Sequence, residues 1–273
     1  MPLDLAVEAK SLTTTLHYLK RGTEKPARYV NDPPQGVPQW NGIDDPQAVR
    51  VEDGRGREQE FTLDRNGFEL VRAPSRVRDF YSDDEVKRSY YPEVEQLLRD
   101  RLGAARVVVF DHTVRNAGRP GTREPSRRVH NDHTLNSAPR RVRYHLGAEA
   151  DELLKHRFGI VNVWRPIRGP VLDSPMALCD AQSFTDDDLI ATDLVYPHVR
   201  GETSSVAYKP GHRWYYFSEM QPDEAVLIRV HDSAADGRAR LSFHTSFDNP
   251  LAPAAPPRES IEVRCLVFFP AAD

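Results

Sequence analysis

The feature that most constrains the fold is a series of short apolar runs that fills the chain from about residue 104 onward. The runs are rich in Val, Ile, Phe, Tyr and Trp, which favour β-strands, and turn-forming residues such as Pro, Gly, Asp and Asn separate them. Short strands at near-regular spacing are typical of a barrel or a jelly roll rather than an alternating α/β sheet. The predicted strands are 105–112, 128–134, 158–166, 175–180, 204–209, 213–218, 224–232, 240–247 and 260–269.

The region before these strands has a different composition. Residues 1 to about 60 are rich in Pro, Gly, Asp and Arg, and we expect irregular loops there that wrap the core. VRVEDGRGREQEF (49–61) and GFELVRAP (67–74) are predicted as a hairpin or two short strands around charged turns. Ser82 and Glu85 form a capping-box pattern, and Gly103 ends the apolar periodicity, so we predict a helix over 82–102. A shorter helix is expected at 148–157.

We therefore expect one mainly β domain over residues 1–273 with flanking helices. In this prediction a loop-rich N-terminal extension, residues 1–80, packs on a strand-rich core, residues 104–270. No composition shift is strong enough to indicate a second domain.

Composition excludes several classes of protein. No run of apolar residues is long enough for a transmembrane helix, and the first residues lack the pattern of a secretory signal. The net charge of -4 argues against a dedicated nucleic-acid binder. The two cysteines, Cys179 and Cys265, are too few for a disulfide framework or a four-cysteine zinc site, which favours a reducing, cytoplasmic setting.

The strongest chemical signal lies among the ten histidines. His130 and Asp132 are two residues apart in an extended segment, so an imidazole and a carboxylate point to the same side. His244, on a later predicted strand, is the candidate third ligand. Two histidines and one carboxylate form the facial triad of non-haem Fe(II) oxygenases, which leaves iron positions open for a co-substrate and dioxygen. An H-x-D pattern alone is weak, because it also occurs in polar surface turns.

Several sequence blocks occur together and in order: RVHNDHT, NVWRPI with PMALCD, WYYFSEMQPDEAVLIRVHDS, RLSFHTSF and RESIEVRCLVFF. With GFELVRAPSRVRDF, YYPEVEQLL and ARVVVFDHTVR they resemble the hydroxylase/desaturase family of secondary metabolism, which includes a fungal gibberellin desaturase and a cephamycin-pathway protein. The resemblance covers roughly residues 50–269. It implies a double-stranded β-helix (jelly-roll, cupin-like) core, Fe(II), 2-oxoglutarate as co-substrate and dioxygen.

Carried over residue by residue, the resemblance makes His130, Asp132 and His244 the metal ligands. It also implies an arginine downstream of His244 for the distal carboxylate of 2-oxoglutarate, since a buried dicarboxylate needs a permanently charged, bidentate partner. Arg258 is favoured by spacing, whereas strand alternation allows Arg264 equally. Either arginine could instead form a salt bridge with a neighbouring glutamate. His133, directly after the motif, could perturb the pocket or compete as a ligand.

Other residues have both a binding and a structural interpretation. Asn162 and Trp164 share one face of their strand and Arg165 takes the other; pocket lining competes there with core packing or an ion pair. Tyr216 is a candidate to face the substrate, although most of its aromatic stripe is expected in the core. Thr134 could bind the co-substrate, but capping of a turn is its more common role.

The leading hypothesis is an Fe(II)/2-oxoglutarate-dependent dioxygenase that hydroxylates or desaturates a small natural-product molecule. A carboxylate ligand favours an oxygenase over a halogenase, which needs that iron position for halide. The alternatives are a cupin-like Zn(II) or Mn(II) enzyme that does not use 2-oxoglutarate, and a non-catalytic accessory protein of a biosynthetic pathway. The N-terminal loops and residues 181–203 are candidates for a substrate lid, and no oligomeric state is predicted.

Overall fold

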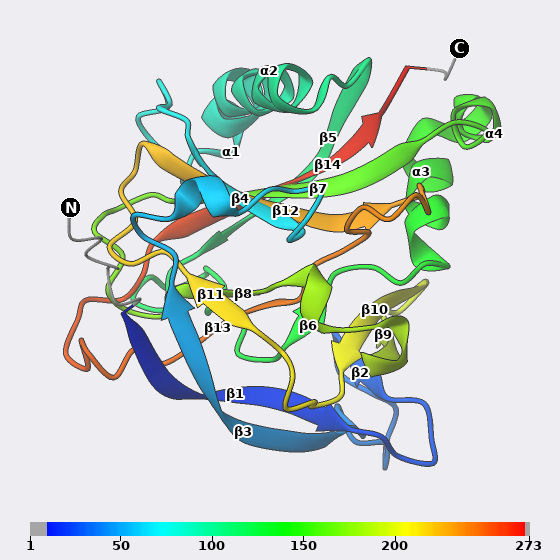
Figure 1. Cartoon of the computed structure of the whole chain (residues 1–273). Helices are drawn as coiled ribbons and strands as arrows, with labels where there is room; N and C mark the ends of the chain where they lie inside the picture. Colours follow the sequence, from blue (N-terminus) through cyan, green and yellow to red (C-terminus); the bar gives the residue numbers. More distant parts are fainter. Residues whose placement is uncertain (1–9, 271–273) are drawn as a thin grey trace.

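Two β-sheets face each other in the computed structural model, which describes residues 10–270 (Figure 1). The larger, nine-stranded sheet has the order β1-β3-β11-β8-β13-β6-β10-β9-β2, and the five-stranded sheet has the order β4-β12-β7-β14-β5. Neighbouring strands are antiparallel except for β3 with β11 and β2 with β9. The predicted mainly β fold is confirmed.

The strands of the nine-stranded sheet are β1 (Ser11–Lys20), β2 (Ala27–Tyr29), β3 (Ile43–Asp53), β6 (His130–Asn131), β8 (Met176–Cys179), β9 (Leu189–Val195), β10 (Arg200–Val206), β11 (Trp214–Tyr216) and β13 (His244–Ser246). Those of the five-stranded sheet are β4 (Phe68–Arg72), β5 (Arg106–Arg115), β7 (Phe158–Pro166), β12 (Glu224–Asp232) and β14 (Ser260–Phe268). The α-helices are α1 (Asp83–Glu85), α2 (Tyr91–Leu102), α3 (Ser137–Leu146) and α4 (Ala150–Leu153), with a π-helical turn η2 (Val86–Tyr90) between α1 and α2. Short 3-10 turns are η1 (Glu58–Glu60), η3 (Gly147–Glu149), η4 (Ala181–Ser183) and η5 (Asp186–Asp188).

Alternation along the strands separates an inner face, between the sheets, from an outer face. Trp164 of β7 and Leu178 of β8 meet in one apolar cluster between the sheets. On the outer face of the five-stranded sheet, Val163 of β7 packs in a second cluster with Val94 and Leu98 of α2. Helix α2 therefore covers the back of this sheet and leaves its front for the site.

The predicted helix over 82–102 is confirmed as the continuous run α1, η2 and α2. Ser82 Oγ accepts a hydrogen bond from the Glu85 amide at 3.3 Å, and Gly103 ends the run in the left-handed conformation with φ 64°. The Glu85 carboxylate accepts from the Arg78 amide. Helix α3 was not predicted, and the helix expected at 148–157 is shorter.

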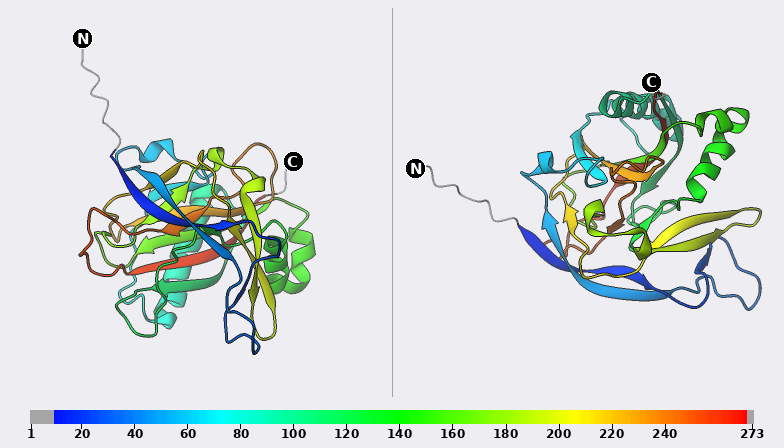
Figure 2. Two further views of the ribbon diagram at one scale, coloured as in Figure 1. Left: turned by 90° about the horizontal axis from the view of Figure 1, so that it is seen from below. Right: turned by 45° about the vertical axis from the view of Figure 1, so that its right-hand side comes forward.

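The expectation of irregular loops over residues 1–60 is wrong for much of this segment. Strand β1 pairs along its full length with β3, and β3 joins β11 in the nine-stranded sheet. Figure 2 shows both strands crossing the side of the molecule opposite α2. Leu16 and Val51 are fully buried there, so long-range pairing outweighs the loop-like composition. Residues 1–9, which belong to the predicted extension and to the stretch judged for a signal, lie outside the described range.

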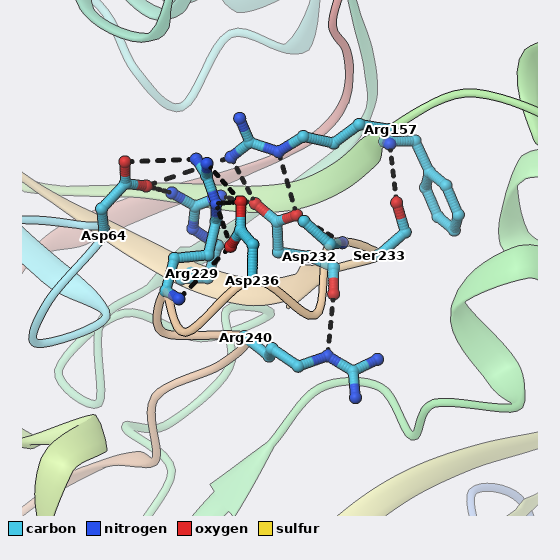
Figure 3. Close-up of polar contacts among 10 residues, drawn as sticks. Asp64, Arg157, Arg229, Asp232, Ser233, Asp236 and Arg240 are labelled. Atoms are coloured by element: carbon cyan, nitrogen blue, oxygen red, sulfur yellow. Dashed lines mark hydrogen bonds and ion pairs between the residues drawn. The ribbon is translucent and has the colours of Figure 1, made fainter. Parts of the chain in front are cut away.

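A buried ion cluster fixes the segment that leads into β13 (Figure 3). Asp232, at the end of β12, is fully buried and accepts hydrogen bonds from Arg157 at 2.7 and 3.1 Å and from Arg229. Arg229 also binds Asp64 at 2.7 Å, and the Asp232 carbonyl accepts from Arg240 at 3.2 Å. The cluster thus ties β12 to two loops, one of which continues directly to His244.

Candidate metal centre

The cross-strand register brings the two candidate histidine ligands together. His130 of β6 and His244 of β13 are direct partners in an antiparallel pair, and their ring centroids are 4.4 Å apart. Asp132 lies just beyond β6, two residues after His130. One ligand atom from each of the three residues lies within 4.8 Å of the others. His130, Asp132 and His244 therefore converge as a metal site requires.

The two imidazoles are held in a form that suits ligation. His130 Nδ1 lies 2.7 Å from the Arg128 carbonyl oxygen, which can only accept, so Nδ1 carries a proton and Nε2 is the ring nitrogen left to face a metal. His130 Nε2 faces Asp132 Oδ1 at 3.5 Å. Burial, reinforced by the neighbouring His130, lowers the pKa of His244 to about 3, so its ring is neutral at physiological pH. Its Nδ1 is buried without a hydrogen-bond partner among residues 10–270.

The carboxylate of Asp132 is held by two donors through one of its oxygens. Oδ2 accepts from Asn162 Nδ2 at 2.7 Å and from Arg264 Nε at 2.9 Å. Burial alone would raise the pKa of Asp132, but the charge of Arg264, together with the contact with His130, outweighs it and holds the pKa well below its ordinary value. The group is therefore an anion ready to bind a cation.

The two candidate arginines have opposite surroundings. Arg264 is fully engaged: besides Asp132 it donates to Asp111 at 3.0 Å, Thr113 at 3.1 Å and Glu262 at 2.5 Å. Arg258 is 4% exposed, donates from Nη1 to the Ser174 carbonyl, and lies 5.2 Å from the Trp164 ring.

The remaining N–H groups of Arg258 have no protein acceptor. Nε and Nη2 are buried, and no partner for them occurs in the part of the chain that the structure describes. Burial, followed by the positive charge of Arg115, lowers the pKa of Arg258 to about 9. A buried guanidinium with free donors calls for an anion that the protein itself does not supply.

Sequence reasoning missed Ser260 at this site. Its Oγ is buried and, within residues 10–270, unpartnered, and so is Nε1 of Trp164. Ser260 and Arg258 are two residues apart as the chain enters β14, so the alternation rule used for His130 and Asp132 was the available signal.

Three sequence candidates are not brought to this centre. Thr134 donates to Glu202 and accepts from the Ser137 amide at 3.0 Å, which is the turn-capping role. Arg165 lies on the outer face of its sheet, over the rings of Phe80 and Tyr90 at 5.4 and 5.3 Å. Tyr216 packs edge-to-face on Phe247 in the cluster on the other side of the nine-stranded sheet.

His133 does not join the ligand cluster, which contains only His130, Asp132 and His244 among the described residues. Its Nδ1 lies 3.2 Å from Ser137 Oγ, and burial lowers its pKa to about 4. Both cysteines are buried and free, as expected for small core residues.

Two imidazoles, one carboxylate and a buried guanidinium with free donors lie between two β-sheets, and this is the set of groups that a non-haem Fe(II) oxygenase with an anionic co-substrate uses. The donor set fits Fe(II), and the free N–H groups of Arg258 fit a carboxylate. Comparison with known proteins agrees: the chain belongs to the Fe(II)/2-oxoglutarate-dependent dioxygenase family that includes the fungal hydroxylase/desaturases. Its cofactors are Fe(II), 2-oxoglutarate and dioxygen.

The relatives match over nearly the whole chain. The hydroxylase/desaturase efuI of Hormonema carpetanum is 33% identical over 291 aligned positions, which cover 97% of each protein. The Fe(II)/2-oxoglutarate-dependent dioxygenase nvfI of Aspergillus novofumigatus is 35% identical, covering 90% of this chain and 92% of that protein. A family model described as "Oxidoreductase/YMDC permease-like domain" matches residues 16–268. Within residues 10–270, none of the helices has the length and apolar character needed to span a membrane.

A solved structure supports the same assignment. The iron and alpha-ketoglutarate-dependent endoperoxidase NvfI superposes with a TM-score of 0.88 at 31% identity, covering 95% of this chain and 98% of that one. The predicted double-stranded β-helix core is confirmed by this match. Membership of this family excludes the two alternative classes, a cupin-like Zn(II) or Mn(II) enzyme that does not use 2-oxoglutarate and a non-catalytic accessory protein.

Proposed function

We propose that this enzyme hydroxylates or desaturates a small natural-product substrate at a centre in which His130, Asp132 and His244 hold Fe(II). Arg258 binds the distal carboxylate of 2-oxoglutarate. The observation that carries the proposal is the pairing of three converging ligands with a buried guanidinium that has two unpartnered nitrogens. Bound Fe(II), together with 2-oxoglutarate and dioxygen, supplies the oxidising chemistry that removes hydrogen from an unactivated C–H bond.

The protein's own residues orient the metal ligands and exclude water from the site. His130 Nδ1 is committed to the Arg128 carbonyl, which orients its ring. Leu178 is the cross-strand neighbour of His244 and packs in the same cluster as Trp164. These buried apolar side chains exclude water beside the ligands, which strengthens electrostatic contacts within the site.

The choice of Arg258 over Arg264 follows from available donors. Arg264 already donates to three carboxylates, so a further carboxylate would have to displace one of them. Arg258 has Nε and Nη2 free and lies beside Trp164 and Ser260, whose polar atoms are also unpartnered within residues 10–270. A dicarboxylate there would satisfy donors that otherwise stay buried and unpaired.

The proposed substrate is a small molecule rather than a nucleic acid, in keeping with the net charge of -4. A single domain and a cytoplasmic location remain part of the proposal. The two free, buried thiols of Cys179 and Cys265 suit a reducing compartment.

The test is an anaerobic titration of the Fe(II)-loaded protein with 2-oxoglutarate, followed by the weak visible metal-to-ligand charge-transfer band. We expect a saturable band in the native protein. Arg258→Met should raise the apparent dissociation constant of 2-oxoglutarate about 10- to 100-fold, because charge-assisted hydrogen bonds contribute roughly 1.5–3 kcal/mol.

Arg165→Met is the matched control, because Arg165 is equally buried but faces the back of the same sheet. It should leave the 2-oxoglutarate titration unchanged. A protein that binds iron but gives no band would contradict the proposed chemistry. A band with unaltered 2-oxoglutarate affinity in Arg258→Met would remove Arg258 from the co-substrate site.

A further inference from the structure

We infer that Asn162 and Arg264 are positioning residues that hold Asp132 through Oδ2, so that Oδ1 alone is presented to iron. The inference rests on the proposed function, because it requires Asp132 to be a ligand. It assigns Arg264 to the metal rather than to 2-oxoglutarate, and Asn162 to the metal rather than to the substrate. Neither residue would touch the iron; both would act through Asp132.

The first argument is that the two carboxylate oxygens of Asp132 have different partners. Oδ2 of Asp132 accepts two hydrogen bonds, at 2.7 Å from Asn162 and 2.9 Å from Arg264, which is the normal capacity of one carboxylate oxygen. Oδ1 faces His130 Nε2 at 3.5 Å, on the side of the other ligands. A carboxylate bound through one oxygen leaves a further iron position for the co-substrate and dioxygen.

The second argument is that Arg264 cannot easily move. Its Nη1 donates to Asp111 and Thr113 of β5, and its Nη2 donates to Glu262 of β14. Arg264 and Asp111 are cross-strand partners, and so are Glu262 and Thr113. Contacts on two paired strands fix the planar fork, leaving Nε aimed at Asp132. A lysine has neither the fork nor the separate Nε, so charge alone would not reproduce this.

The third argument is that Asn162 and Arg264 form a pair. They are cross-strand partners between β7 and β14, and both side chains point into the space between the sheets. Asn162 is fully buried, and its Nδ2 donates a hydrogen bond to Asp132 Oδ2 at this site. Adjacent strands thus deliver two donors to the same oxygen, which fixes the carboxylate plane more firmly than either donor alone.

Co(II) is the probe for this inference, because its visible absorption reports the number and geometry of ligands without dioxygen chemistry. The variants are Arg264→Met, which removes the fork, and Asn162→Leu, which keeps the branched shape of the Asn162 side chain but removes its donor. We expect each variant to bind Co(II) about 10- to 100-fold more weakly than the native protein. The visible spectrum of the bound metal should also change, because Asp132 could then turn and offer both oxygens.

Arg264→Lys separates position from charge, and we expect its Co(II) affinity and spectrum to resemble those of Arg264→Met. Recovery of native affinity and spectrum by lysine would overturn the inference, because charge would then be sufficient. Arg55→Met is the control for loss of an anchored arginine. Arg55 donates to Glu224 at 2.6 Å, and this pair is not part of the metal centre. This variant should leave Co(II) binding unchanged.

Asn162→Leu removes a neutral donor, so it keeps the test open if an Arg264 variant fails to fold. Native affinity and an unchanged spectrum in Asn162→Leu and Arg264→Met would overturn the inference while the proposed function stood. A native protein that bound neither Co(II) nor Fe(II) would instead overturn the proposed function and the inference with it.

Discussion

Replacing His244 with alanine is expected to lower the affinity for Fe(II) by more than about 100-fold and to abolish the charge-transfer band with 2-oxoglutarate. Loss of a residue that only supports a ligand typically lowers metal affinity by about 10- to 100-fold, and loss of the ligand itself must lower it further. His244 is buried opposite His130, and no other histidine in the described range joins the cluster. Equilibrium dialysis of Fe(II) under anaerobic conditions measures the effect.

His231→Ala is the matched control for that experiment. His231 is also a buried strand histidine, but it packs on Phe158 at 5.0 Å and lies outside the ligand cluster. Both variants remove the same buried ring, so thermal unfolding should report destabilisation in both, whereas iron binding should fail only in His244→Ala. Native iron affinity in His244→Ala would count against the triad.

The second large effect concerns stability rather than chemistry. Asp232→Ala should lower the free energy of unfolding by about 3–5 kcal/mol, because it removes the fully buried carboxylate that compensates Arg229. Arg229 is 1% exposed and would keep only Asp64, which is largely exposed, as a partner carboxylate. Urea denaturation of the metal-free protein, with the slope held equal, measures the change.

Asp236→Ala provides the comparison, because Asp236 pairs with Arg238 at the surface of the same segment. Exposed pairs contribute little, so this variant should unfold at nearly the native urea concentration. Equal and small effects in the two variants would show that the buried cluster is not a source of stability. If Asp232→Ala is strongly destabilising, it should also disturb the metal centre, because the cluster fixes the segment that leads to His244.

Local signals made much of the fold predictable. The short apolar runs at 158–166, 224–232 and 260–269 correspond closely to β7, β12 and β14. The prediction for β1 and β3 failed because the burial of each strand depends on a partner elsewhere in the chain. The Pro and Asp residues in this segment indicate loops when they are taken alone. Strand β6, only two residues long, shows the same dependence on context.

The sequence by itself determined the chemistry: an H-x-D pattern puts an imidazole and a carboxylate on one side of an extended chain, and a later strand supplies His244. It could not separate Arg258 from Arg264, because spacing favours Arg258 whereas strand alternation allows Arg264 equally. Only the tertiary structure decided their surroundings. It places three carboxylates around Arg264, two of which, Asp111 and Asp132, are distant in the sequence, and it buries Arg258 with free donors.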